Sequence, residues 1–174
     1  IRGIMFLIKK ITQHYDPEQD RIGLTVQNTE GQVMMLWLTQ RLVNRLASVL
    51  ADWLDRDVKT MAGEHSIFSL HVWEQSAAKA QLKPEFPVEQ AAAQSEALVN
   101  VVDLGRAPDG YTLTFKWKSE GAARLMLKAT EMRQWLIILY RQFDTAGWSK
   151  QSWPEWFADD AQCSTPSSMH SILH

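Results

Sequence analysis

The sequence predicts an α+β fold, built as a duplicated antiparallel β-hairpin-plus-helix unit with two sheets and two long amphipathic helices. The first observation is residues 21–54, RIGLTVQNTEGQVMMLWLTQRLVNRLASVLADWL, where an alternating pattern, a turn and a helical apolar repeat follow one another. The second is a similar pattern 90 positions later, which becomes visible when Glu30-Gly31 is aligned with Glu120-Gly121. Under that alignment the helix residues Leu42, Leu46, Val49 and Trp53 fall on Met132, Leu136, Leu139 and Phe143.

Length and composition indicate one domain. The chain has 174 residues, of which 45% are hydrophobic and 22% charged, so it can bury one core. We expect a single domain over residues 1–174 with a pseudo-repeat at about 5–56 and 66–147. A linker at about 75–96 and an aromatic C-terminal extension at 148–174 complete this organisation.

The elements of the first half follow from simple patterns. Residues 5–15 read as a strand that stops at the proline-containing acidic turn 16–20. Ile22, Leu24 and Val26 alternate with polar or small residues, which is typical of a strand with one face exposed to solvent. Residues 33–38 form a more apolar strand, and Thr39 caps a helix whose apolar positions recur at steps of three and four.

The middle of the chain is harder to assign. Phe68, Leu70 and Val72 alternate with Ser69, His71 and Trp73, which predicts a strand. Residues 75–96 are rich in Ala, Gln, Lys and Pro, have no apolar period, and are expected to form an excursion or mobile linker. The part after Glu89 has a short helix as an alternative.

The second half repeats the first in its order of elements. Residues 98–104 form a strand, Ala107-Pro108-Asp109-Gly110 a hairpin turn, and residues 111–117 an alternating strand. After a strand at 124–128, Thr130 is expected to cap a helix that Gly147 ends in a left-handed conformation. Ser152 and Pro154 then favour the start of a short helix.

Net charge and cysteine content limit how anionic partners could bind and which cellular compartment suits the protein. The formal net charge is −2 at pH 7, so nucleic acid or an anionic surface would have to bind a local patch. The single cysteine, Cys163, excludes an intramolecular disulfide and suits a cytoplasmic protein. No apolar run approaches the length of a membrane span, and no membrane association is expected.

No catalytic, cofactor or metal motif is found. His65 and His71 have no cysteine or carboxylate cluster at ligand spacing, and His170 and His174 lie near the end of the chain. The acidic residues of turn 16–20 have the spacing of a calcium loop but not its glycine and distant glutamate. We therefore expect a protein that is not an enzyme and has no cofactor; a catalytic site between the two halves ranks third among the functional hypotheses.

A basic strand face is the candidate nucleic-acid surface. Five basic residues lie between positions 106 and 128, against two acidic residues, Asp109 and Glu120. The five are Arg106, Lys116, Lys118, Arg124 and Lys128. Such a face suits the backbone of a single strand, although Tyr111, Phe115 and Trp117 should point away from it to the core. A solvated outer face with no ligand is the alternative.

The order of elements, several strands and then a helix used twice, resembles the Whirly and PC4 class of single-strand-binding proteins. The resemblance covers most of residues 5–147 and implies that sheet faces carry nucleic acid. The lysine- and glycine-containing strand motif of the Whirly family has no counterpart in this chain. No functional residue is transferred on this basis.

The aromatic extension is the candidate protein contact. Eight tryptophans are present, and Trp148, Trp153, Trp156 and Phe157 are concentrated in ten residues. Such a cluster either folds back on its own chain or docks on a partner or a second copy. The first functional hypothesis is therefore a non-catalytic binding or assembly subunit, which acts through this segment or an exposed helix face. The second is a single-stranded nucleic-acid binder.

Overall fold

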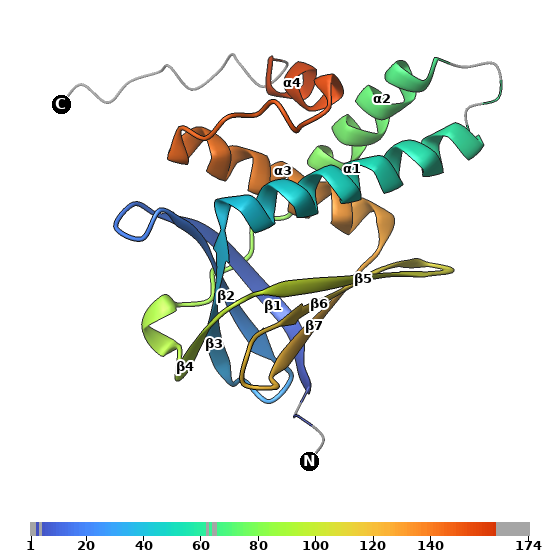
Figure 1. Cartoon of the computed structure of the whole chain (residues 1–174). Helices are drawn as coiled ribbons and strands as arrows, with labels where there is room; N and C mark the ends of the chain where they lie inside the picture. Colours follow the sequence, from blue (N-terminus) through green and yellow to red (C-terminus); the bar gives the residue numbers. More distant parts are fainter. Residues whose placement is uncertain (1–2, 4, 62, 64–65, 163–174) are drawn as a thin grey trace.

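The computed structural model describes residues 3, 5–61, 63 and 66–162 and has an α+β architecture (Figure 1). The strands are β1 (Met5–Asp16), β2 (Arg21–Asn28), β3 (Val33–Thr39), β4 (Ser95–Leu98), β5 (Val101–Ala107), β6 (Gly110–Lys116) and β7 (Ala122–Leu127). The helices are α1 (Gln40–Met61), α2 (Ile67–Ala80), α3 (Ala129–Ala146) and α4 (Glu155–Gln162), with a short 3-10 turn, η1 (Gln90–Ala92).

The strands form one mixed sheet in place of the two antiparallel sheets expected from the sequence. Its order is β4-β3-β2-β1-β7-β6-β5. The pairs β1–β7 and β3–β4 are parallel, and the others are antiparallel. The parallel pairs join strands distant in the sequence, which hairpin patterns do not reveal.

Two stretches of chain, β1 and the consecutive strands β4 and β5, each pair with two different strands. In β1, Met5–Leu7 pairs with β7 and Ile8–Asp16 pairs with β2, with a register shift between Ile8 and Lys10 in the second pairing. The two end strands of the sheet, β4 and β5, are consecutive in the chain. Between them, Val99 N–H donates to Trp37 and Asn100 N–H donates to Lys116. The sheet therefore closes on itself.

Helices cover the inner side of this sheet in two layers. In Figure 1, α1 and α3 lie over the strands, and α2 and α4 lie farther from the sheet. Inward side chains of β2, β3, β6 and β7 join α1 and α3 in one apolar core, exemplified by Leu24, Leu113, Leu50 and Leu139. Burial of this core provides most of the driving force for folding.

The buried positions of α1 and α3 lie 89 residues apart, which corrects the alignment at 90. Those of α1 include Val43, Leu46, Ala47, Leu50, Ala51 and Leu54, and those of α3 include Met132, Trp135, Leu136, Leu139, Tyr140 and Phe143. The strand registers have the same spacing, since Leu24 pairs with Leu36 and Leu113 pairs with Leu125. Val49, expected in the core, is 39% exposed. A one-residue error rotates a helix by about 100° and exchanges the faces of a strand.

Residues 67–80, which include the expected strand around Phe68–Val72, form helix α2. Ser66 caps it by accepting a hydrogen bond from Ser69 N–H at 3.5 Å. The buried face of this helix carries His71, Gln75 and Ala78, while Trp73 is 67% exposed. Hydrophobic periodicity fails here because the face that packs inward is polar. The expected linker at 75–96 accordingly begins only after Ala80, and its end belongs to β4.

The caps of the other helices match the expectations in part. Thr39 Oγ accepts a hydrogen bond from Leu42 N–H, and Gly147 ends α3 with a φ of 67°. Helix α3 begins at Ala129 and not after Thr130, because Glu131 reaches back to accept Lys128 N–H. This hydrogen bond is the glutamate half of a capping box, and the return bond is absent because a lysine side chain cannot accept one.

The core assignment in α1 gives a direct test. Leu50 is 1% exposed and its neighbour Val49 is 39% exposed. We expect Leu50→Ala to lower the free energy of unfolding by about 2–5 kcal/mol and Val49→Ala by less than about 1 kcal/mol. Urea unfolding measures both values. Equal losses would contradict the observed helix orientation.

Candidate binding surface

The acidic turn after β1 is structural. Asp16 Oδ1 accepts hydrogen bonds from the backbone N–H groups of Glu18 and Gln19. Asp20 accepts from the Tyr15 hydroxyl and from the Trp148 indole N–H. Among the residues that the structure describes, no three His, Cys, Asp or Glu side chains gather to hold a metal. His65, Cys163, His170 and His174 lie outside the described residues.

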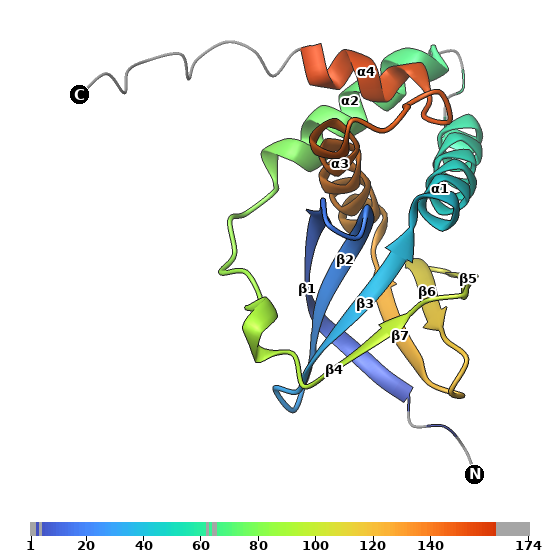
Figure 2. The same cartoon turned by 60° about the vertical axis from the view of Figure 1, so that its left-hand side comes forward.

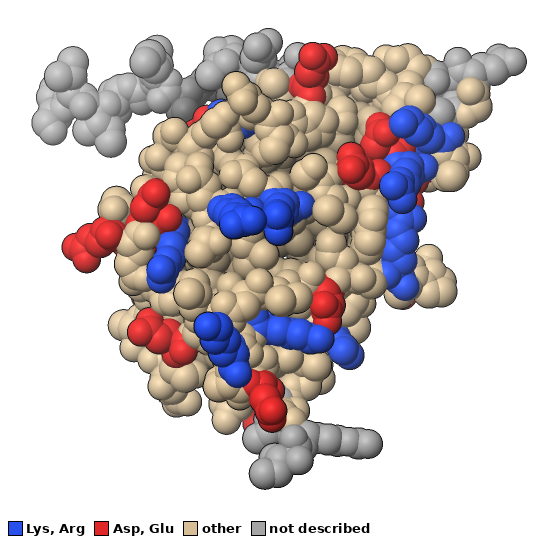
Figure 3. Space-filling model, in the orientation of Figure 1, with Lys and Arg blue, Asp and Glu red and all other residues tan. Residues whose placement is uncertain are grey.

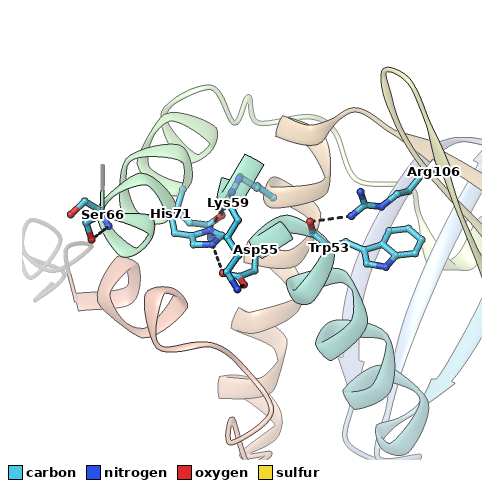
Figure 4. A network of polar contacts seen from close by, with 9 residues as sticks. Trp53, Asp55, Lys59, Ser66, His71 and Arg106 are labelled. Carbon is cyan, nitrogen blue, oxygen red and sulfur yellow. Dashed lines mark hydrogen bonds and ion pairs between the residues drawn. The ribbon is translucent and has the colours of Figure 1, made fainter. Parts of the chain in front are cut away.

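His71 is buried between helices and is not the partly wet strand residue that the pattern predicted. Its Nε2 lies 3.0 Å from Asp55 Oδ1, and its Nδ1 lies 3.4 Å from the guanidinium of Arg133 (Figure 4 shows the Asp55 side). Because a guanidinium only donates, Nδ1 accepts and the ring proton lies on Nε2, which donates to Asp55. The ring also stacks on Trp156, with centroids 4.1 Å apart.

Arg133 is the second buried polar centre of this helical layer. It is 4% exposed, donates to Gln75 at 2.9 Å, and lies over the Trp156 ring at 5.4 Å. It forms no ion pair with a described carboxylate. Residues of α1, α2, α3 and α4 thus meet at one cluster, whose hydrogen bonds and ring contacts join the outer helices to the inner ones.

The pKa of His71 is lowered from 6.5, chiefly by burial. The hydrogen bond to Asp55 raises the pKa, whereas Arg133 and Lys59 lower it further. The carboxyl of Asp55 has a lowered pKa because of its hydrogen bond with Lys59. The structure therefore stabilises a neutral imidazole facing one carboxylate and two cations.

The four aromatic residues expected to contact a partner are all buried within the chain. Trp148, Trp153, Trp156 and Phe157 are between 2% and 8% exposed. Trp153 packs edge-on against Tyr140 and Phe143 of α3, with ring centroids 5.1 and 5.3 Å apart. Of the two alternatives for this segment, the structure has the one in which it folds back on its own domain.

The five basic candidates do not form one free surface. Arg106 is tied to Asp57 by an ion pair at 2.9 Å and stacks over Trp53, and Lys116 forms an ion pair with Asp103. Tyr111 also donates to Asp57, and burial together with this hydrogen bond raises the pKa of Tyr111 to about 12. In Figure 3, basic and acidic side chains alternate over this face without a continuous area of one sign.

Lys118, Arg124 and Lys128 are exposed and have no ion-pair partner among the described residues. Arg124 donates from Nε to the Thr114 hydroxyl at 3.3 Å. This bond fixes its stem over β6 and leaves the terminal nitrogens of the guanidinium available.

The chain segment 81–94, here called the strap, lies along the outer side of β1 and β3. Val88 N–H donates to Thr12 Oγ1 at 2.9 Å, and Gln94 N–H donates to the Val33 carbonyl at 3.0 Å. Figure 2 shows the strap running along the outside of the sheet. Beneath it Met35 is 2% exposed and Trp37 is 5% exposed.

The corresponding outer face of the second half has no cover in the described part of the chain, and we call it the open face. Strand pairing arranges its side chains in rows that run across β1, β7, β6 and β5. One row is Met5, Ala122, Lys116 and Val101. The next row is Leu7, Arg124, Thr114 and Asp103. Met126, 89 positions after Trp37, is 70% exposed. Leu7 and Val101 are 51% and 50% exposed. The sequence shows the alternation of these residues but not the long-range cover that separates the two faces.

A groove, here called the β1–β7 groove, opens where β1 and β7 separate after their short parallel pairing. Its volume is about 550 Å³, and it lies between β1, β7, α3 and the first part of the strap. Phe86, on the strap, is 95% exposed at this groove. Sequence reasoning missed this site because it depends on the closure of the sheet.

No protein-family model matches the chain, and the searches of curated proteins and of solved structures also give no match. Within the described residues, no helix has the length and apolar character needed to cross a membrane.

The buried imidazole predicts a pH-dependent stability. Because the folded-state pKa of His71 lies below 6.5, its contribution is complete above about pH 6.5 and is lost as the pH falls through the folded-state value. We expect urea unfolding between about pH 8 and about pH 5 to show this loss in the wild type and a smaller one in His71→Gln. His14→Gln is measured alongside, because burial also lowers the pKa of His14 and its contribution to the pH dependence remains in His71→Gln. An unchanged pH dependence in His71→Gln would contradict the assignment.

Proposed function

We propose that this protein is a non-catalytic binding or assembly subunit and that its open face contacts a protein partner. The observation that carries this proposal is the contrast between two corresponding positions, Trp37 at 5% and Met126 at 70% exposure. Leu7 and Val101 are further exposed apolar side chains on this face, in rows that also carry Arg124 and Lys116. Clustered apolar side chains on a sheet face are typical of a protein interface.

We also propose that the two faces correspond because the chain carries one strand-strand-strand-helix unit twice. The support is the common spacing of 89 positions in the β2–β3 and β6–β7 registers and in the buried residues of α1 and α3. Under this proposal α2 and the strap are insertions between the copies. The first copy then has its outer face covered internally, and the second offers its face to a partner.

Capture from extracts of the native host, with and without nuclease, tests the protein-contact proposal. We expect wild-type bait to retain a protein after nuclease treatment and Met126→Lys bait to lose it, because a buried unpaired ammonium disfavours an apolar contact. Val49→Lys is the matched control, since Val49 is 39% exposed on α1. Equal retention by Met126→Lys would contradict a contact at the open face.

Single-stranded nucleic acid is a second candidate ligand. The specific observation is that Lys118, Arg124 and Lys128 have no ion-pair partner among the described residues. Lys9, Lys10 and Lys83 at the β1–β7 groove are also without one, and Phe86 supplies an exposed ring. Cations along a groove with a stacking ring are the features that single-strand binding uses.

Fluorescence anisotropy with a labelled thymidine oligomer tests this candidate. We expect binding at low salt that weakens as salt is added, and a salt slope smaller by about 2 in a variant with Lys118→Gln, Arg124→Gln and Lys128→Gln. The control carries Arg41→Gln, Arg45→Gln and Arg56→Gln, which makes the same charge change on exposed positions of α1. No binding at low salt, or equal loss in both variants, would contradict this candidate.

A further inference from the structure

We propose that the β1–β7 groove binds an extended, acidic peptide segment of a protein partner, which pairs with the open strand edges as an added strand. This inference deepens the proposed function, because Met126 belongs both to the open face and to the wall of the groove. It names the kind of segment that the partner presents.

The groove is a gap in the sheet. Parallel pairing of β1 with β7 ends at Leu7 and Arg124, beyond which the two strands have no mutual register. Residues 8–13 of β1 form one wall and Leu125–Leu127 of β7 form the other. Trp135 and Ile138 of α3 line the groove between them.

Both walls present backbone hydrogen-bonding groups. Each wall strand has an antiparallel partner on its other edge only, β2 for β1 and β6 for β7. In an antiparallel pair, alternate residues direct N–H and C=O away from the partner. No other described strand pairs with these edges. An extended segment in the groove would therefore find donors and acceptors on both sides, as in β-strand addition.

The charges at the groove favour an acidic segment. Lys9, Lys10 and Lys83 line it, are exposed, and have no ion-pair partner among the described residues. Two carboxylates also line it, and one of these, Glu131, accepts the Lys128 backbone N–H. The lining therefore carries three ammonium groups against two carboxylates, Glu85 and Glu131, which leaves a net positive charge.

Phe86 has the properties of an anchor for the bound segment. Its side chain is 95% exposed, the highest value among the large hydrophobic residues of the described chain. Pro84 and Pro87 flank it closely and restrict the backbone, so that presenting the ring costs little additional entropy on binding. The bond from Val88 N–H to Thr12 holds this part of the strap on β1.

Apolar walls and strand edges favour a peptide over nucleic acid in this groove. A polynucleotide lacks the regular N–H and C=O spacing of a strand and would use chiefly the lysines. Leu127, Ile138 and Met126 supply contacts for alternate apolar side chains of a peptide. The volume of about 550 Å³ lies within the range of about 300–1,000 Å³ that is usual for ligand sites.

The test uses the ¹⁵N-labelled full chain and two pools of end-blocked synthetic peptides. In the first pool glutamate alternates with valine, isoleucine or phenylalanine, and in the second lysine replaces glutamate. Changes in backbone amide chemical shifts locate the binding site. We expect the acidic pool to shift the amides of Lys10, Ile11, Leu125 and Leu127, and the basic pool to leave them unchanged.

Two further experiments test strand pairing by the peptide backbone and the role of Phe86 as an anchor. Backbone N-methylation of the acidic peptides removes donors, and we expect it to weaken binding about tenfold. Phe86→Ala should weaken binding by a similar factor. Trp73→Ala is the matched control, because Trp73 is 67% exposed on α2 and should have no effect on binding.

Several results would overturn the inference: no shifts at the groove, equal binding of the basic pool, or shifts there produced only by a thymidine oligomer. Shifts confined to the open face around Val101 and Lys116 would leave the proposed function standing and remove the groove as the peptide site. Peptide binding in the groove together with full partner retention by Val101→Lys bait, whose changed residue lies on the open face and not at the groove, would remove the open-face contact and leave the groove inference standing.

Discussion

The divided pairing of β1 is the constraint on which the rest of the structure depends. Its first residues join β7 in parallel and its later residues join β2, with a register shift at Lys9. This strand joins the two halves into one sheet, and the β4–β5 stretch makes the second connection. The change of partner along β1 that joins the two halves also opens the β1–β7 groove, so one backbone feature accounts for both the architecture and a candidate site.

The helical layers separate the polar groups that hold the fold from those available to a ligand. His71 and Arg133 are among the most suggestive side chains for chemistry, yet both are buried under Trp156 and joined to neighbouring helices. Burial of paired polar groups specifies how α2 and α4 dock. The groups that remain accessible are apolar side chains and unpaired cations on the sheet.

Local patterns in the sequence identify most of the elements, and long-range contacts explain the differences. The strands and the two long helices follow apolar periodicity, and Gly147 ends α3 as expected. Helix α2 was missed because its inward face carries His71 and Gln75, whose partners come from α1 and α3. The accessibility of Met126, and its contrast with the cover over Trp37, depends on the path of the strap. No local pattern specifies that path.

The strap lies over Met35 and Trp37, whereas Met126 on the open face has no such cover among the described residues. Methionine oxidation by dilute peroxide, followed by peptide mass spectrometry, tests this difference most directly, because the rate depends on side-chain exposure. Met35 is 2% exposed beneath the strap, and Met126 is 70% exposed on the open face. The account predicts rapid oxidation of Met126 and slow oxidation of Met35 in the native protein, with similar rates in denaturant. Equal rates in the native protein would contradict it.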